Sequence, residues 1–481
     1  MPDVILSVLQ RLMPSRLSRL ALPRLAQIFA ILENTDGTRN AERTALLAFA
    51  IRILSAAVAF LSQIILARSM GGFEYGIFVF IWVFVIIAGN LSCLGLHTTV
   101  IKFLPQYETT GQNSHIRGLT FISRVFAIII ASIFALIGVG AVFFFENSIP
   151  DYYLVPIILG GCAIPMIALG DVLDGTSRAN NWPIVALSPT FIIRPGLIIL
   201  FVLGAILIGY EANARLALLC ALASTYITTL AQFITVTYKL GNRFQKGHYE
   251  WEIKQWVGVS IPIFFIEGFY YLLTNADVII VGFFLSPERV AIYFAAAKTM
   301  ALVHFIYFAV KAGAAPRFSA LYASGDMDAL NKFVKQTARW TFFPTIAMGA
   351  FVIVFGQFIL SMFGESFIEG YTVMAILLIG ILAKACIGPG EVLLFMAGHQ
   401  KICTIIYAVT LSANLSLNFA LIPLFGIMGA AMATAGAMFI EAILLFIVIY
   451  KKMDIMMFVF SPATKQNVPN YTVQTNRKST S

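Results

Sequence analysis

Five basic residues lie inside long apolar stretches of this sequence, where a charge is costly. They are Arg52, Arg124, Arg194, Lys298 and Lys384. A charge at the centre of a membrane helix costs roughly 2.5–3.5 kcal/mol on insertion scales. Arg194 and Lys384 fall about 15 to 18 Å from the nearest end of their stretches, Lys298 about 12 Å, and Arg52 and Arg124 about 6 to 10 Å. The two deepest residues therefore need a wet cavity or an acidic partner, whereas Arg52 and Arg124 can also extend to the aqueous boundary.

Helix-breaking residues stand beside both of the deepest charges. Arg194 precedes Pro195-Gly196, and Lys384 is followed by Gly388-Pro389-Gly390. Proline and glycine free backbone groups in a helix, and within a membrane such breaks persist only where protein or water satisfies those groups. Both breaks predict a lumen or a hinge, with a simple packing kink as the alternative.

The deeply placed acidic residues all belong to the second half of the chain: Glu267, Asp277, Glu391 and Glu441. The first half has deep arginines and no deep acid. We therefore expect the first half to present positive potential to a cavity. Such a surface suits a phosphate or pyrophosphate, which the guanidinium fork of arginine binds well. Glu391 is seven residues from Lys384, and its alternative role is to neutralise that lysine.

A second group of candidates lies on the seventh apolar stretch. Glu267 and Tyr271 share one helical face, and Asp277 follows further along. Carboxylates within a membrane often carry protons in transporters, so Glu267 and Asp277 are candidates for proton coupling. Tyr270 and Tyr271 are candidates for contact with sugar rings.

The composition shows which solvent surrounds these residues. Of 481 residues, 59% are apolar and 11% are charged, against roughly 45–50% and 25% in soluble proteins. Twelve apolar stretches are long enough to be membrane helices, in two sets of six. They predict an all-α polytopic membrane protein with twelve transmembrane helices in two six-helix lobes around a central cavity. The predicted stretches are 45–66, 77–99, 120–145, 152–172, 184–210, 215–238, 257–285, 290–311, 341–363, 372–396, 402–424 and 427–450.

The distribution of positive charge predicts the orientation. Of the 32 Lys and Arg residues, 24 lie on the side of the amino terminus, three on the opposite side and five within the stretches. Because cytoplasmic loops carry the excess of Lys and Arg, both termini are expected in the cytoplasm. The expected segments are a basic amphipathic region at 1–44, a first lobe at 45–238, a cytoplasmic linker at 239–256, a second lobe at 257–450 and a polar tail at 451–481. Within 312–340, Asp326 is expected to cap a helix.

Several activities lack their sequence signals. There is no Gly-Lys dipeptide and hence no Walker A loop, no clustered His/Cys metal site and no catalytic Ser or zinc motif. A membrane polymerase or ligase needs a large outer loop, and the predicted outer loops are short. We therefore expect a transporter rather than an enzyme, without a cofactor or a metal, and the orientation explains the net charge of +9 without a nucleic-acid partner.

Two segments carry a family resemblance: ILARSMGGFEYG at 65–76 and NLSLNFALIPLFGIMGAA at 414–431. Together with 275–282, 292–297, 320–326 and 363–365, they resemble the O-antigen-flippase type of polysaccharide biosynthesis protein. That type belongs to the multidrug/oligosaccharidyl-lipid/polysaccharide exporter superfamily. The resemblance covers about 45–450, and the extension before it has no assigned role.

The resemblance implies a flippase in a bacterial inner membrane that works by alternating access. Its substrate would be an undecaprenyl-diphosphate-linked oligosaccharide for O-antigen, capsule or exopolysaccharide. The implied partners are this lipid-linked substrate, membrane lipids, and the polysaccharide polymerase and chain-length machinery. The five intramembrane cations, Tyr270 and Tyr271 are then candidates for substrate binding. The alternative is a multidrug cation antiporter of the same superfamily, which would need acidic residues in both lobes.

Overall fold

The computed structural model describes residues 40–145, 147, 149–244 and 247–461, and these residues form helices and no strands. The helices are long because the apolar stretches contain few internal breaks, and eleven of them are long and apolar enough to cross a membrane. The elements are α3 (Asn40–Ser92), α4 (Leu96–Thr109), α5 (Asn113–Phe144), α6 (Asp151–Ala179), α7 (Pro183–Ser188), the π-helix η3 (Pro189–Ile193), α8 (Arg194–Leu207), α9 (Ala214–Arg243), α10 (Ile253–Phe284), α11 (Pro287–Ser324), α12 (Met327–Val354), α13 (Gly356–Ser361), the 3₁₀-helix η4 (Glu365–Gly370), α14 (Tyr371–Ile387), α15 (Gly390–Met396), α16 (Gln400–Phe425) and α17 (Ile427–Met453).

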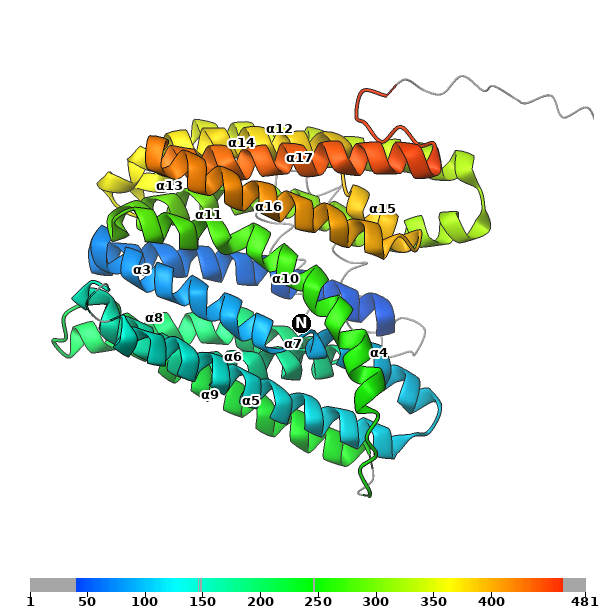
Figure 1. The fold of residues 1–481 in the computed structure, drawn as a ribbon, viewed down its shortest axis with the longest axis horizontal. Helices are drawn as coiled ribbons and strands as arrows, with labels where there is room; N and C mark the ends of the chain where they lie inside the picture. The colour runs from blue at the N-terminus through cyan, green and yellow to red at the C-terminus, as the bar shows by residue number, and fades with distance from the viewer. Residues whose placement is uncertain (1–39, 146, 148, 245–246, 462–481) are drawn as a thin grey trace, which may run out of the picture.

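One of the eleven, α3, contains two membrane spans. At Gly71 its backbone has φ 77° and ψ 171°, a conformation that glycine adopts easily. The chain reverses there, and the two arms of α3 run back side by side (Figure 1). With both arms counted, the described residues contain twelve spans, which confirms the prediction.

Three local predictions are also confirmed. The Asp326 side chain accepts a hydrogen bond of 2.9 Å from Ala329 N and caps α12. The helix before Arg194 widens into the π-helix η3, and α14 ends at Ile387 ahead of the Gly-Pro-Gly break. The backbone is therefore irregular beside both deep charges, although α8 itself continues without interruption through Pro195-Gly196.

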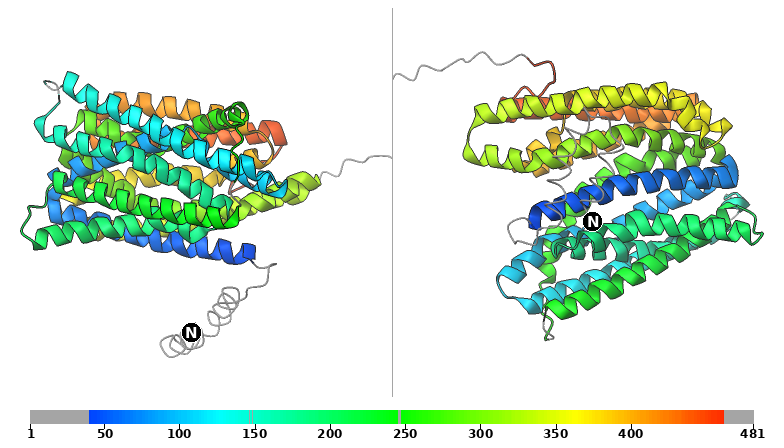
Figure 2. Two further views of the ribbon diagram at one scale, coloured as in Figure 1. Left: turned by 90° about the horizontal axis from the view of Figure 1, so that it is seen from below. Right: turned by 180° about the vertical axis from the view of Figure 1, so that it is seen from behind.

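The helices run roughly along the long axis of the molecule and form two lobes, which lie one above the other in the view of Figure 1 (Figures 1 and 2). We call α3 to α9 the first lobe and α11 to α17 the second lobe. Between them, α10 starts against α4 and ends against α16, crossing from one lobe to the other (Figure 1).

The lobes meet tightly at the end that carries Gly71. We call it the outer end, because the charge distribution predicts that it faces away from the cytoplasm. A Cβ atom on Gly76 would lie 1.8 Å from the backbone oxygen of Pro287, so the two backbones touch. The Arg68 side chain donates to the backbone oxygens of Met362 at 2.7 Å and Ser361 at 2.8 Å. Buried Tyr75 packs beside the ring of Phe294. These contacts close the outer end.

Several helices extend beyond their predicted limits, and two differences at the inner end bear on the site. Helix α6 runs to Ala179 rather than ending near residue 172, because the polar residues of its last two turns pack within the first lobe. After α17, residues 454–461 are not a polar tail: Met457 is fully buried, and Val459 N donates to Cys386 O at 3.0 Å. The amphipathic segment predicted before the first span lies mostly outside the described residues.

Candidate functional site

A cavity of about 750 Å³ lies between the lobes in their inner halves. Its α11 residues begin at Phe305, 18 residues from the outer start of that helix, which is roughly 27 Å along the axis. Aromatic rings form much of the wall, and Lys311 provides its charge. The lining residues are Ser55, Phe191, Tyr270, Phe305, Phe308, Ala309, Lys311, Ala312, Ala315, Val392, Phe395 and Met396.

A second, smaller cavity of about 50 Å³ lies within the second lobe, and Tyr270 lines both cavities. Lys384 lines the smaller one, where its Nζ donates to Glu441 Oε1 at 2.7 Å. Glu391 instead lies 3.2 Å from Lys311 and accepts a 2.5 Å hydrogen bond from Tyr307. The alternative, in which Glu391 neutralises Lys384, is met only in part: Lys384 forms its ion pair with Glu441, and Glu391 acts on it as a second nearby negative charge.

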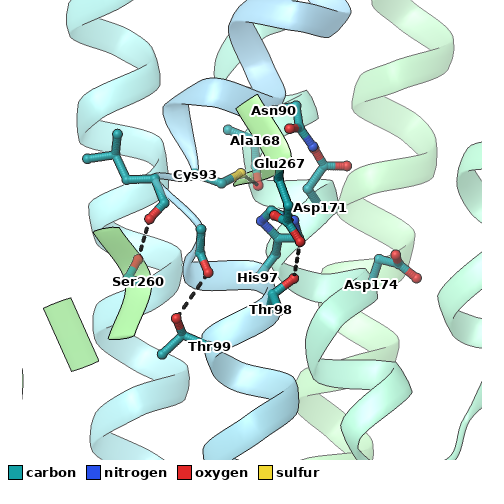
Figure 3. Close-up of polar contacts among 12 residues, drawn as sticks. Asn90, Cys93, His97, Thr98, Thr99, Ala168, Asp171, Asp174, Ser260 and Glu267 are labelled. Atoms are coloured by element: carbon teal, nitrogen blue, oxygen red, sulfur yellow. Dashed lines mark hydrogen bonds and ion pairs between the residues drawn. The ribbon is translucent and has the colours of Figure 1, made fainter. Parts of the chain in front are cut away.

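The first lobe holds a polar cluster that we define as Asn90, His97, Thr98, Asp171 and Glu267 (Figure 3). His97 Nε2 lies 2.8 Å from Glu267 Oε2, and Thr98 donates to Glu267 Oε1 at 2.7 Å. Asn90 donates to Asp171 at 3.2 Å. The expectation that the first lobe contains no deep acid is wrong, since Asp171 lies on the membrane-spanning helix α6.

The predicted positive potential of the first lobe is weakened by these acids. Arg194 lies 5.7 Å from the ring of Trp82 and is attracted by Asp171. One turn further along α6, Asp174 forms an ion pair with Arg178. Arg194 and Arg178 thus each have a carboxylate nearby, which offsets their positive charge in the first lobe.

The other predicted residues are dispersed. Arg124 donates to Thr237 at 3.1 Å, between α5 and α9 and apart from the lining of the large cavity. Lys298 lies 4.9 Å from the ring of Phe294 and lines neither cavity. The side chain of Arg52 lies outside the described part of the structure.

The two predicted proton-coupling carboxylates face opposite lobes. Glu267 contacts α4 of the first lobe. Asp277 is buried and accepts hydrogen bonds from Tyr293 at 2.5 Å and Thr434 at 3.3 Å, both in the second lobe. The adjacent residues Tyr270 and Tyr271 also face different lobes. Tyr270 packs beside Tyr407 of the second lobe, and Tyr271 is close enough to Asp171 of the first lobe to interact with its charge.

Sequence reasoning missed His97, Asp171 and Lys311 as possible site residues. Asp171 was set at the edge of a predicted span that was drawn a few residues too short. Lys311 is the last residue of the predicted stretch 290–311, where a lysine is common, and His97 belongs to no known motif. The signal for Asp171 and His97 was a polar residue within or beside an apolar stretch.

The sequence and the architecture of this chain are similar to those of known proteins. The family model "Polysaccharide biosynthesis protein" matches residues 43–322, more than half of the chain. The chain belongs to the polysaccharide biosynthesis protein family. A second model, MatE, matches residues 262–420 of the chain.

Other proteins are similar to this chain in sequence or in fold. An uncharacterized membrane protein of Methanocaldococcus jannaschii, MJ1068, is 23% identical over 416 residues, which cover 80% of this chain and 79% of that protein. A multidrug resistance MATE family transporter in its inward-facing conformation has a similar fold, with a TM-score of 0.70, 14% identity, and coverage of 83% of this chain and 94% of that one. The lipid II flippase MurJ in an inward closed conformation gives a TM-score of 0.65 at 15% identity, covering 84% and 87%. The protein therefore has the multi-pass helical fold of these two transport proteins and is a member of the polysaccharide biosynthesis protein family.

Proposed function

We propose that this protein flips an undecaprenyl-diphosphate-linked oligosaccharide from the cytoplasmic to the periplasmic leaflet of a bacterial inner membrane, for surface polysaccharide assembly. The observation that carries the proposal is the large cavity, closed at the outer end, in a member of the polysaccharide biosynthesis protein family. Flipping changes no covalent bond, so the protein's task is to bind, shield and release.

The cavity wall suits an amphipathic ligand with sugars and phosphates. Phe305, Phe308 and Phe395 offer rings on which sugar faces can stack and apolar surface for a lipid chain. Lys311 lies on the same wall and offers a positive charge to a phosphate. Its ion pair with Glu391 offsets part of that charge. Tyr270 lines this cavity, and Lys384 lines the smaller cavity that Tyr270 also reaches, so we expect both to contribute. Arg194, Tyr271, Arg124 and Lys298 line neither cavity.

Proton coupling, in this proposal, uses Glu267 rather than Asp277. Glu267 lies between the lobes with a titratable partner, His97, and both side chains keep some exposure, at 30% and 17%. Asp277 is enclosed and satisfied by Tyr293, Thr434 and the backbone of Val278. A carboxylate that changes its partner during transport must be accessible to solvent, and the partly exposed Glu267 side chain meets this condition.

A multidrug cation antiporter is the second candidate, and one observation favours it. An antiporter is expected to have acidic residues in both lobes, and Asp171 with Asp174 supplies them in the first. The MatE match over 262–420 points in the same direction. The two functions make opposite predictions for a deletion strain.

Deleting the gene should remove the surface polysaccharide and leave complete lipid-linked repeat units on the inner leaflet, because synthesis continues while transfer stops. The measurement is surface polysaccharide together with lipid-linked oligosaccharide, in the deletion strain and after complementation. Normal polysaccharide with raised sensitivity to cationic dyes would contradict the flippase and favour the antiporter. Complementation with Lys311→Ala at matched protein level should lower export, and Lys298→Ala is the matched control.

A further inference from the structure

We propose that α10 is divided between the lobes: its inner half moves with the first lobe, its outer half moves with the second, and the helix bends near Gly268 when the lobes rock. The linker before α10 would then be a fixed part of the first lobe rather than a flexible connection. The contacts of α10 carry this inference, and it holds for any substrate.

The segment before α10 is fastened to the hairpin between α4 and α5. Glu250 N donates to Ser114 O at 3.2 Å, and Arg117 donates to His248 O at 3.0 Å. His115 lies between two carboxylates, 3.1 Å from Glu250 and 3.3 Å from Glu252. We call residues 248–252 the clamp, because backbone and side chains both hold it to the first lobe.

The clamp continues into the first turns of α10. Tyr107 of α4 donates to Glu252 at 2.7 Å and accepts a hydrogen bond of 2.9 Å from the ring nitrogen of Trp256, which is fully buried. Burial of the phenol, and then its contact with Glu252, raise the pKa of Tyr107 to about 12. The hydroxyl therefore stays protonated at neutral pH and keeps donating to Glu252.

Contacts with α4 recur once per turn along the inner half of α10. Ser260 donates to the backbone oxygen of Leu94. A Cβ on Gly95 would lie 2.5 Å from Ser260 O and 2.9 Å from Phe264 N, so the backbones touch there. Glu267 ends the series at His97 and Thr98. The contact positions are 252, 256, 260, 264 and 267, a spacing that places them on one helical face.

The outer half of α10 presents another face to the second lobe. Tyr270 packs beside Tyr407, Asp277 is bonded to Tyr293, and the ring of Phe284 lies 5.7 Å from Phe419. The positions 270, 277 and 284 are seven residues apart, so they too form one stripe. At about 100° per residue, the two stripes are roughly 80° apart around the helix.

The junction of the two stripes is Gly268 and Phe269. A helix fixed at its ends to two bodies must bend when those bodies rotate against each other. The outer half also touches the first lobe, where a Cβ on Gly282 would lie 2.2 Å from the ring of Phe80. That contact is apolar and belongs to the closed outer end, so it can part when this end opens, whereas the inner contacts are hydrogen bonded.

Spin-label distances test the inference without a substrate. In a background with Cys162→Ser and Cys386→Ser, one pair of nitroxides is placed at Tyr238 and Glu250, and another at Glu250 and Lys401, all exposed positions. The pairs are compared between the parent protein in nanodiscs and Gly76→Leu, which cannot close its outer end. We expect the distance from 238 to 250 to stay constant and the distance from 250 to 401 to change. A changed first distance with a constant second one, or no change in either, would overturn the inference.

Disulfide locking tests the same inference in cells, where a variant that fails to fold is recognised by its low protein level. Oxidised Ser114→Cys/Glu250→Cys fixes the clamp to the first lobe, and polysaccharide export should continue. Oxidised Gly72→Cys/Glu288→Cys joins the lobes at the outer end, and export should stop until a reductant is added. If the first disulfide also stops export reversibly, the clamp must detach during transport and the inference fails. Loss of the flippase assignment would leave the spin-label result standing, so the two failures are distinguishable.

Discussion

Replacing Gly76 with leucine should abolish export and hold the outer ends of the lobes apart. In the closed structure a Cβ at this position would lie 1.8 Å from Pro287 O and 2.4 Å from its carbonyl carbon. Both atoms belong to the backbone of the helix start, so no side-chain rotation removes the overlap. The closed state becomes inaccessible, and an alternating-access transporter that cannot close one end cannot complete its cycle.

The measurement is labelling of a cysteine at Phe367, a buried outer-end residue beside Tyr75, by a membrane-impermeant thiol reagent. Labelling in intact cells should rise at least about tenfold in Gly76→Leu, which corresponds to a shift of about 1.4 kcal/mol or more. Gly72→Ala is the matched control, because its Cβ would lie 3.9 Å from Glu288, an ordinary contact. Equal labelling of a folded Gly76→Leu protein and the control would show that the outer end does not close as described.

The helices of this protein could be predicted from sequence because the membrane imposes their length. A span needs about 20 apolar residues with every backbone group bonded within the helix, so an apolar stretch leaves few alternatives. The backbone irregularities beside Arg194 and at Gly388-Pro389-Gly390 were predictable for the same reason, since proline and glycine act on the local backbone. The Asp326 cap is likewise a local interaction between residues three apart.

The partners of the charged residues could not be predicted, because they depend on packing between helices distant in sequence. Lys384 is seven residues from Glu391 but 57 from Glu441, and it pairs with Glu441. Glu267 and Asp277 lie on one helix, yet they face different lobes. The position of a charged residue in its apolar stretch predicts its depth along the membrane normal. Only the tertiary structure shows which lobe its side chain faces.

The acids of the first lobe show how one boundary error alters a functional prediction. With the fourth span drawn to residue 172, Asp171 was counted at its edge and Asp174 in a loop. Helix α6 continues to Ala179, so the carboxylates of Asp171 and Asp174 both lie on a helix of the first lobe. The predicted contrast between a basic first lobe and an acidic second lobe then disappears, and with it the argument against cation transport.

Replacing Lys384 with alanine should destabilise the protein by about 3–5 kcal/mol, because it leaves the Glu441 carboxylate buried without its partner. The side chains of Lys384 and Glu441 are 11% and 6% exposed, and 2.7 Å separates the Nζ and Oε1 atoms. The double variant Lys384→Met/Glu441→Leu removes both charges together and should recover the stability, since apolar replacements of a buried pair are often neutral or favourable by about 1–4 kcal/mol. The measurement is the free energy of unfolding in detergent micelles, with Lys401→Ala at an exposed position as a control that should change it by roughly 0.5 kcal/mol or less.

Export by the same variants separates structure from substrate binding. If Lys384 only neutralises Glu441, the double variant recovers both stability and export. If Lys384 also binds the phosphates of the substrate through the small cavity that it shares with Tyr270, stability returns and export does not. Equal stability of Lys384→Ala and the parent would show instead that the ion pair is solvated in the membrane. The second outcome is the one that we expect, because a pair retained for stability alone gains little over the methionine and leucine that would replace it.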